Sequence, residues 1–206
     1  MEIKNFPKAT VILRGYPYQQ IRTVVKNLIG TKLRSVEITM NTPGALEAIQ
    51  KVNREFGDRI MVGAGTVLTY EEAEAAIQAG AAFILSPIML EKRILDLCKE
   101  KSVVSVPAAF TPSEIKRLLC DGADIVKVFP AGRLGSKYIS DIQAPLGKMP
   151  LMAVGGINAG NAQEYFDAGT SYVGIASGIF EKEDILNQND EGLKKAILKF
   201  EEKVVW

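Results

Sequence analysis

The chain has 206 residues, of which 47% are apolar, and its 25 basic and 24 acidic residues leave a net charge of +1. This balance argues against a surface built to bind nucleic acid or an acidic membrane. The sequence contains no histidine, which excludes a histidine triad, a histidine general base and a histidine-bound metal.

Eight short apolar runs recur along the chain, and a segment with helical periodicity follows each of them. In chain order the runs span residues 9–15, 35–40, 60–65, 83–87, 103–108, 124–130, 151–156 and 171–177. One unit takes about 26 residues, close to the shortest strand–helix unit that can cross over to a parallel strand. The runs are nearly continuous in apolar residues, as expected for a parallel sheet that is covered on both faces.

The segments between the runs carry apolar stripes and helix-end signals. Two stripes at helical spacing consist of Leu46, Ile49, Val52 and Phe56, and of Leu193, Ile197, Phe200 and Val204. Thr111-Pro112-Ser113-Glu114 predicts a helix start, and Gly80, Gly122 and Gly169 predict helix ends. No linker or compositional break interrupts the series, so residues 1–206 are expected to form a single (β/α)8 TIM barrel domain. A doubly wound open sheet is the alternative fold.

Targeting signals are missing from the chain. The N-terminal residues MEIKNFPK lack the apolar segment of a signal peptide, and no apolar run approaches membrane-spanning length. Cys98 and Cys120 are far apart and lie in segments expected to be helical, so we interpret them as structural and reduced. These features predict a soluble cytoplasmic protein with no membrane and no nucleic-acid partner.

Lys127 is the first candidate for chemistry because it lies in the centre of the apolar run ADIVKVFPA. Strand alternation places it on the same face as Ile125 and Phe129. Burial without a partner disfavours the ammonium form and lowers the pKa of a lysine. Two interpretations follow: a buried ion pair that only fixes the barrel, or a nucleophilic amine.

Three further polar residues lie in or just after the predicted strands, where the active site of such a barrel is found. Glu37 is surrounded by apolar neighbours in its strand and is the natural partner for the lysine. Arg14 ends the first strand and could clamp a carboxylate, or could be a surface residue. Thr66 follows the third strand and could meet the substrate, or could cap the helix expected at residues 71–79.

Glycines gather after the last two predicted strands. Gly155 and Gly156 end the seventh run, while Gly174, Ser177 and Gly178 lie at the end of the eighth. Barrels often bind phosphate at these two loops through backbone N–H groups, which glycine allows a phosphate to approach closely. An amine, a carboxylate, a carboxylate clamp and a phosphate site, with no metal ligands or cofactor motif, together suit Schiff-base chemistry on a phosphorylated keto acid.

The motifs ILRG, VEITMNTP, VGAGTVL, LSP, VPAAFTPSE, VKVFPA and AVGGIN, in this order, resemble the 2-keto-3-deoxy-6-phosphogluconate / 4-hydroxy-2-oxoglutarate aldolase family over nearly the whole chain. The resemblance implies a metal-free class I aldolase, usually trimeric, that releases pyruvate and glyceraldehyde 3-phosphate. It implies that Lys127 forms the Schiff base and that Glu37 is the acid–base. It also matches Thr66 and Pro87 to substrate-site positions, and Gly155, Gly156 and Ser177 to phosphate-site positions.

Two positions distinguish branches of this family. Gluconate-type members carry an arginine where this chain has Asn41, and a threonine where it has Val154. The galactonate-type branch is more similar, and there Arg14 would take over the carboxylate clamp. Valine cannot hydrogen-bond a C4 hydroxyl, so the preference for one epimer is expected to loosen or invert. Ile88 and Ala108 replace glycines and are expected to narrow the pocket.

Other functions stay open from the sequence. The substrate could be 4-hydroxy-2-oxoglutarate. A phosphate-binding barrel isomerase or synthase acting on ribulose or thiamine phosphates would share the glycine loops but give Lys127 no covalent role. A non-catalytic barrel would keep Lys127 and Glu37 only as a buried pair.

Overall fold

The computed structural model describes residues 5–206 and contains one parallel sheet. Its strands are β1 (Ala9–Leu13), β2 (Ser35–Thr39), β3 (Met61–Gly65), β4 (Phe83–Leu85), β5 (Val104–Val106), β6 (Ala108–Ala109), β7 (Val126–Val128), β8 (Leu151–Val154) and β9 (Tyr172–Ile175). They are hydrogen-bonded in the order β5-β4-β3-β2-β1-β9-β8-β7-β6. Each of the eight predicted runs therefore contains a strand.

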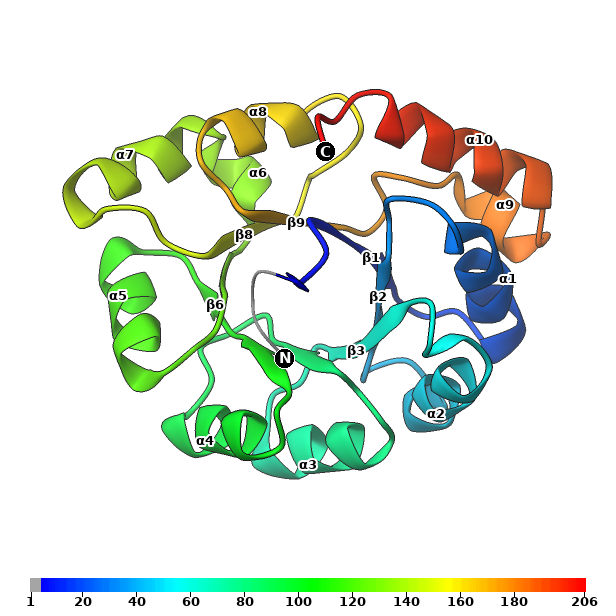
Figure 1. Cartoon of the computed structure of the whole chain (residues 1–206), viewed down its shortest axis with the longest axis horizontal. Helices are drawn as coiled ribbons and strands as arrows, with labels where there is room; N and C mark the ends of the chain where they lie inside the picture. Colours follow the sequence, from blue (N-terminus) through cyan, green and yellow to red (C-terminus); the bar gives the residue numbers. More distant parts are fainter. Residues whose placement is uncertain (1–4) are drawn as a thin grey trace.

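The sheet closes into a barrel at the fifth run. β5 pairs with β4, and β6 pairs with β7, yet β5 and β6 are separated only by Pro107. Proline has no N–H to donate to a ladder, so one predicted strand becomes two short ones. The two ends of the strand order are thus neighbours along the chain, which confirms the TIM barrel and excludes the open sheet (Figure 1).

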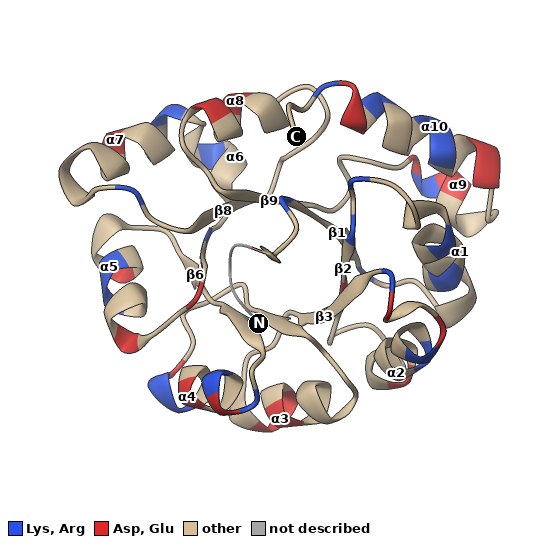
Figure 2. Ribbon diagram, viewed as in Figure 1, with Lys and Arg blue, Asp and Glu red and all other residues tan. Residues whose placement is uncertain are grey.

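Helices form the outer layer around the barrel (Figure 1). They are α1 (Tyr18–Leu28), α2 (Ala45–Phe56), α3 (Tyr70–Gln78), α4 (Lys92–Glu100), α5 (Pro112–Asp121), α6 (Ala131–Leu134), α7 (Lys137–Leu146), α8 (Ala162–Asp167), α9 (Lys182–Leu186) and α10 (Asp190–Glu201). Most of the charged residues lie on these helices and on the loops that adjoin them (Figure 2). A charge on a barrel strand is therefore an exception that needs an explanation.

The helix signals are mostly confirmed, with local differences. Thr111 and Glu114 form a reciprocal capping box at the start of α5. Leu46 was expected in the buried stripe of α2 but is 38% exposed, because the helix turns Ala45 and Ala48 toward the sheet instead. Val204 is buried, as expected, although α10 has already ended.

Two apolar layers lie on either side of the sheet. The outer layer packs the helices against the strands, and the inner layer fills the barrel. In the inner layer Phe6 packs edge-on against Phe83 and Tyr172, with ring centroids 5.2 and 5.4 Å apart. Since Phe6 precedes β1, these rings fill the N-terminal end of the barrel and leave the C-terminal end for polar groups.

The two cysteines differ in their burial. Cys98 is buried, which raises the pKa of its thiol to about 12, and it packs as a core residue. Cys120 is also a free thiol and lies on α5, a helix as expected, but its side chain is exposed. Within residues 5–206, none of the helices combines the length and the apolar character needed to cross a membrane.

Candidate active site

Glu37 and Lys127 face each other across the barrel. Glu37 is the central residue of β2 and Lys127 that of β7. Counting β5 and β6 as one strand, β2 and β7 are four strands apart in both directions around the sheet. Ile125 belongs to the inner layer and Val126 to the outer one, so the alternation that the sequence predicted for β7 is confirmed.

Burial changes the proton affinity of both groups. The exposed fraction is 1% for Glu37 and 4% for Lys127. Burial raises the pKa of Glu37 to about 7, against the opposing charges of Lys127 and Arg14. Burial likewise lowers the pKa of Lys127 to about 8; the nearby Glu37 carboxylate opposes this shift, and Arg14 adds to it. Both groups therefore exchange protons close to neutral pH.

The Glu37 carboxyl has an unsatisfied oxygen. Its Oε2 is buried and accepts no hydrogen bond from any described residue. Buried polar atoms without a partner are uncommon, and at a functional site they mark a position for a water or a substrate group. This oxygen is therefore free to hydrogen-bond to a small polar molecule.

Gly65 makes room for the Glu37 side chain. A Cβ at this position would overlap the carboxylate, because β3 lies directly beside β2 with Thr39 paired to Gly65. The role of this glycine depends on which strand neighbours β2, which the sequence alone does not state.

Hydrogen bonds tie the loop after β1 to the loop after β2. Arg14 donates from Nη1 to Asn41 Oδ1 at 3.0 Å. The backbone N–H of Gly15 donates to Thr42 Oγ1 at 2.8 Å, and Thr42 Oγ1 lies 2.9 Å from Thr39 Oγ1. Arg14 is exposed but close enough to shift the pKa values of both buried groups, so the structure brings Arg14 and Asn41 to the site.

Thr66 and Pro87 also lie at the C-terminal ends of their strands. Thr66 follows β3 with a φ of 57°, a left-handed conformation that is strained for a threonine and is often found at functional sites. The alternative that it caps α3 is wrong, because Thr69 forms the capping box. Pro87 lines an apolar cleft of about 240 Å³ together with Ile88, Ala108 and Phe129.

A small cavity of about 190 Å³ lies between the loops after β8 and β9. Its lining includes Gly155, Gly156, Ser177 and Gly178, so the structure brings the predicted phosphate residues together. The backbone N–H groups of Gly156, Ser177 and Gly178 donate to no acceptor within the described chain. Backbone N–H groups that converge in this way are suited to binding an anion. Val154 is buried at the end of β8 and directly precedes Gly155 of this lining.

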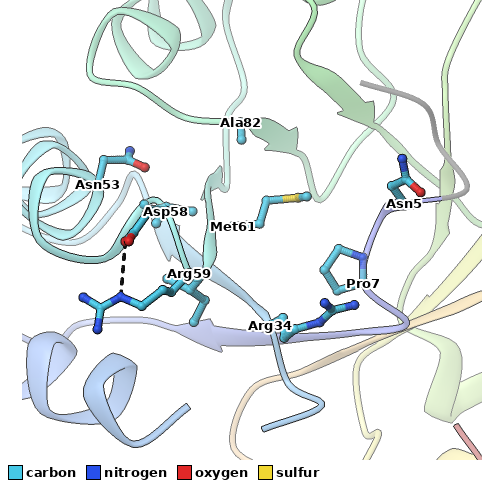
Figure 3. A pocket seen from close by; sticks show the side chains of 11 residues that line it. Asn5, Pro7, Arg34, Asn53, Asp58, Arg59, Met61 and Ala82 are labelled. Carbon is cyan, nitrogen blue, oxygen red and sulfur yellow. Dashed lines mark hydrogen bonds and ion pairs between the residues drawn. The ribbon is translucent and has the colours of Figure 1, made fainter. Parts of the chain in front are cut away.

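Clefts also open at the other end of the barrel. One of about 340 Å³ is lined by residues that precede strands, including Pro7, Arg34 and Ala82, and by the ion pair of Asp58 and Arg59 (Figure 3). These residues lie at the N-terminal end of the sheet, away from Glu37 and Lys127. Since TIM barrels carry their catalytic groups at the C-terminal end, size alone does not identify the site.

Residues 5–206 contain no cluster of three or more histidine, cysteine, aspartate or glutamate side chains suited to a metal ion.

Phe129 was predicted to share a face with Lys127 but was not selected as a site residue. Its ring centroid lies 4.7 Å from Lys127 Nζ. The signal was present in the spacing, because residues two apart on a strand share a face.

Comparison with known proteins agrees with this geometry. The profile described as "KDPG and KHG aldolase" matches residues 4–196. The chain is 33% identical to the "Probable 2-dehydro-3-deoxy-6-phosphogalactonate aldolase" of Rhizobium meliloti, over 82% of this chain and 80% of that protein. It is 36% identical to the 2-dehydro-3-deoxy-phosphogluconate aldolase of Treponema pallidum, over 69% of this chain and 67% of that protein.

Among solved structures, the KDPG aldolase of Legionella pneumophila, with pyruvate captured as a covalent carbinolamine, superposes with a TM-score of 0.85 at 24% identity, over 95% of each chain. At this identity the superposition supports the fold alone. The profile match and the two relatives carry the assignment. The chain therefore belongs to the KDPG and KHG aldolase family.

Proposed function

We propose that this protein is a class I aldolase that cleaves a 2-keto-3-deoxy-6-phospho sugar acid to pyruvate and glyceraldehyde 3-phosphate. The observation that carries the proposal is the buried amine of Lys127 opposite the buried carboxyl of Glu37, both with pKa values shifted toward neutrality. A neutral amine is a nucleophile, and a carboxyl that changes protonation near pH 7 can serve as both acid and base.

The reaction begins when the neutral Lys127 amine attacks the C2 ketone. Glu37 donates a proton to the carbinolamine hydroxyl, water leaves, and a protonated iminium remains. The Glu37 carboxylate then removes the proton of the C4 hydroxyl, the C3–C4 bond breaks, and its electron pair passes into the iminium to form an enamine. The aldehyde leaves, C3 takes a proton from Glu37, and hydrolysis of the iminium frees pyruvate and Lys127.

The remaining residues are assigned to binding. Arg14, which hydrogen-bonds to Asn41, is assigned to clamp the C1 carboxylate. Thr66 and Pro87, at the C-terminal ends of their strands, are assigned to contacts with the same substrate. The free N–H groups around Gly156 and Ser177 are suited to the phosphate at the far end of the substrate. Metal ions and organic cofactors have no part in this scheme.

Reductive trapping tests the proposal. Incubation with pyruvate and borohydride should attach pyruvate irreversibly to one residue, read by peptide mass as a modified Lys127. A phosphate-binding isomerase or synthase, or a barrel that only binds sugar phosphates, would give no adduct. Absence of the adduct at saturating pyruvate would remove the aldolase proposal.

The galactonate-type epimer is the proposed substrate, because Val154 offers no hydroxyl where the C4 group would lie. Val154→Thr should raise the kcat/KM for the gluconate-type epimer relative to the galactonate-type epimer by about tenfold, the size expected for one added hydrogen bond. Steady-state assays of both epimers, and of 4-hydroxy-2-oxoglutarate, give the ratio. Val154→Ala is the matched control, since it changes the size of the side chain but adds no hydroxyl. An unchanged ratio in Val154→Thr would contradict the branch assignment.

A homotrimer is proposed as the state in solution. Four exposed apolar side chains, Leu68, Ile88, Met89 and Phe110, all lie on the loops after β3, β4 and β6. Apolar residues gathered on one sector of a surface indicate a protein interface. Light scattering after gel filtration should give three times the chain mass of 22.4 kDa. Ile88→Asp should lower this mass toward the monomer, whereas Leu198→Asp, an exposed leucine on α10, should not.

The cytoplasm is the proposed location of this reaction. Both cysteines are free thiols, as a reducing compartment allows, and Cys98 is buried in the core as a thiol. Phosphorylated keto acids are charged metabolites that do not cross a bilayer unaided, so an enzyme for them belongs where they are made.

A further inference from the structure

The Phe129 ring touches the nitrogen on which the proposed chemistry depends. Lys127 Nζ lies over the ring at 4.7 Å from its centroid. This is well within the distance of about 6 Å at which a cation is attracted to the face of an aromatic ring. Lys127 is also only 4% exposed, so little water screens the contact.

The ring is held in this position by its neighbours. The backbone N–H of Phe129 donates to the carbonyl of Ala109 in β6 at 3.2 Å. Gly155 packs against one edge of the ring, and a Cβ at Gly155 would come within 3.2 Å of two ring carbons. Because Gly155 has no Cβ, the ring can lie against this glycine with its face directed at the amine.

The reaction places a positive charge on this nitrogen. The amine attacks as a neutral group, and the iminium that follows is cationic once water has left. Glu37 loses its proton in the same step and lies across the barrel, while Arg14 adds an unfavourable positive charge nearby. The quadrupole of an aromatic face favours the cation over the neutral amine without supplying a proton acceptor.

We propose that Phe129 is a catalytic residue whose ring stabilises the cationic iminium nitrogen of Lys127. The inference rests on the proposed Schiff-base function and adds an electrostatic role to a ring that would otherwise only fill space. Glu37 moves the protons, and Phe129 stabilises the charge that stays on nitrogen between those transfers.

Graded fluorination of Phe129 tests this role. Site-specific replacement by 4-fluoro-, 3,5-difluoro- and 3,4,5-trifluorophenylalanine weakens the negative face of the ring and changes its size little. The pyruvate concentration that gives half-maximal borohydride-trapped adduct at Lys127 should rise with each added fluorine, by about threefold to thirtyfold over the series. Phe129→Leu should also raise this pyruvate concentration. Phe129→Tyr, which keeps the aromatic face, should need the same concentration as the unmodified protein.

The same fluorinated residues at Phe83 provide the matched control, because that ring is buried in the barrel but packs against Phe6. Fluorination of Phe83 should not change the pyruvate concentration that gives half-maximal trapped adduct. A flat response across the Phe129 series, with normal trapping in the unmodified protein, would overturn the role of the ring and leave the aldolase proposal intact. Failure of the unmodified protein to form any adduct would instead overturn the aldolase proposal and this inference with it.

Discussion

Replacement of Lys127 by methionine is expected to reduce the cleavage of every keto acid substrate by several orders of magnitude. Methionine has nearly the length of lysine and suits the apolar neighbours of the inner layer, but it has no nucleophile. Without the amine no iminium forms, and the carbanion left by C3–C4 cleavage has no electron sink. Steady-state assays with the phosphorylated substrate, together with borohydride trapping, measure the loss.

The fold should survive this change. Removal of Lys127 takes away the charge that opposes the raised pKa of Glu37, so that pKa should rise further and the carboxyl should stay protonated near pH 7. A neutral carboxyl avoids the cost of a buried, unpaired charge. Circular dichroism spectra and the midpoint of thermal unfolding at pH 6 should therefore match those of the unmodified protein. A variant that folds and still cleaves substrate would show that another residue is the nucleophile.

The barrel could be predicted because its signals are local. Eight apolar runs, the capping box at Thr111 and the helix-ending Gly122 each follow from a few adjacent residues. The split of the fifth run also has a local cause in Pro107, although it was not predicted. Leu46 was misplaced because a helix of this amphipathicity can meet the sheet at more than one rotation, and the packing of α2 selects Ala45 and Ala48.

The composition of the site was predictable, but its internal contacts were not. Lys127 and Glu37 could be selected as charges inside apolar runs, since few physical reasons place a charge there. That Gly65 leaves room for Glu37 depends on the pairing of β2 with β3, which joins residues distant in sequence and which no periodicity within one run encodes. The spacing of Phe129 from Lys127 places both on one face of their strand, but how closely the ring approaches the amine depends on side-chain positions.

Replacement of Glu37 by glutamine is expected to lower kcat by about a hundredfold to ten-thousandfold, the usual contribution of a general acid–base. Glutamine keeps the shape of the side chain, fits the space beside Gly65 and can still hydrogen-bond to a substrate hydroxyl, but it cannot transfer a proton. Binding should change less than turnover, so KM should move by much less than kcat. Glu37→Asp keeps the carboxyl but shortens the side chain, so its kcat should lie between those of the unmodified protein and Glu37→Gln.

The pH dependence of the same variant separates a proton-transfer role from a structural one. In the unmodified protein, kcat/KM should rise as pH passes about 7 and fall as it passes about 8. Because the two groups interact, the acidic and alkaline limbs of this pH profile describe the pair and not either residue alone. Below about pH 7 both groups hold a proton, and Lys127 is then an ammonium ion that cannot attack the ketone. Above about pH 8, Glu37 has no proton left to give to the departing hydroxyl.

Glutamine at position 37 removes one of these titrations. Because the Glu37 carboxylate raises the pKa of Lys127, its loss should lower that pKa, so the free amine should persist toward lower pH. The residual activity should then rise with pH through one limb to a plateau, with no decrease above pH 8. Persistence of the alkaline limb would assign it to a group other than Glu37. A profile that loses that limb while the unfolding midpoint is unchanged can come only from a carboxyl that exchanges protons during turnover.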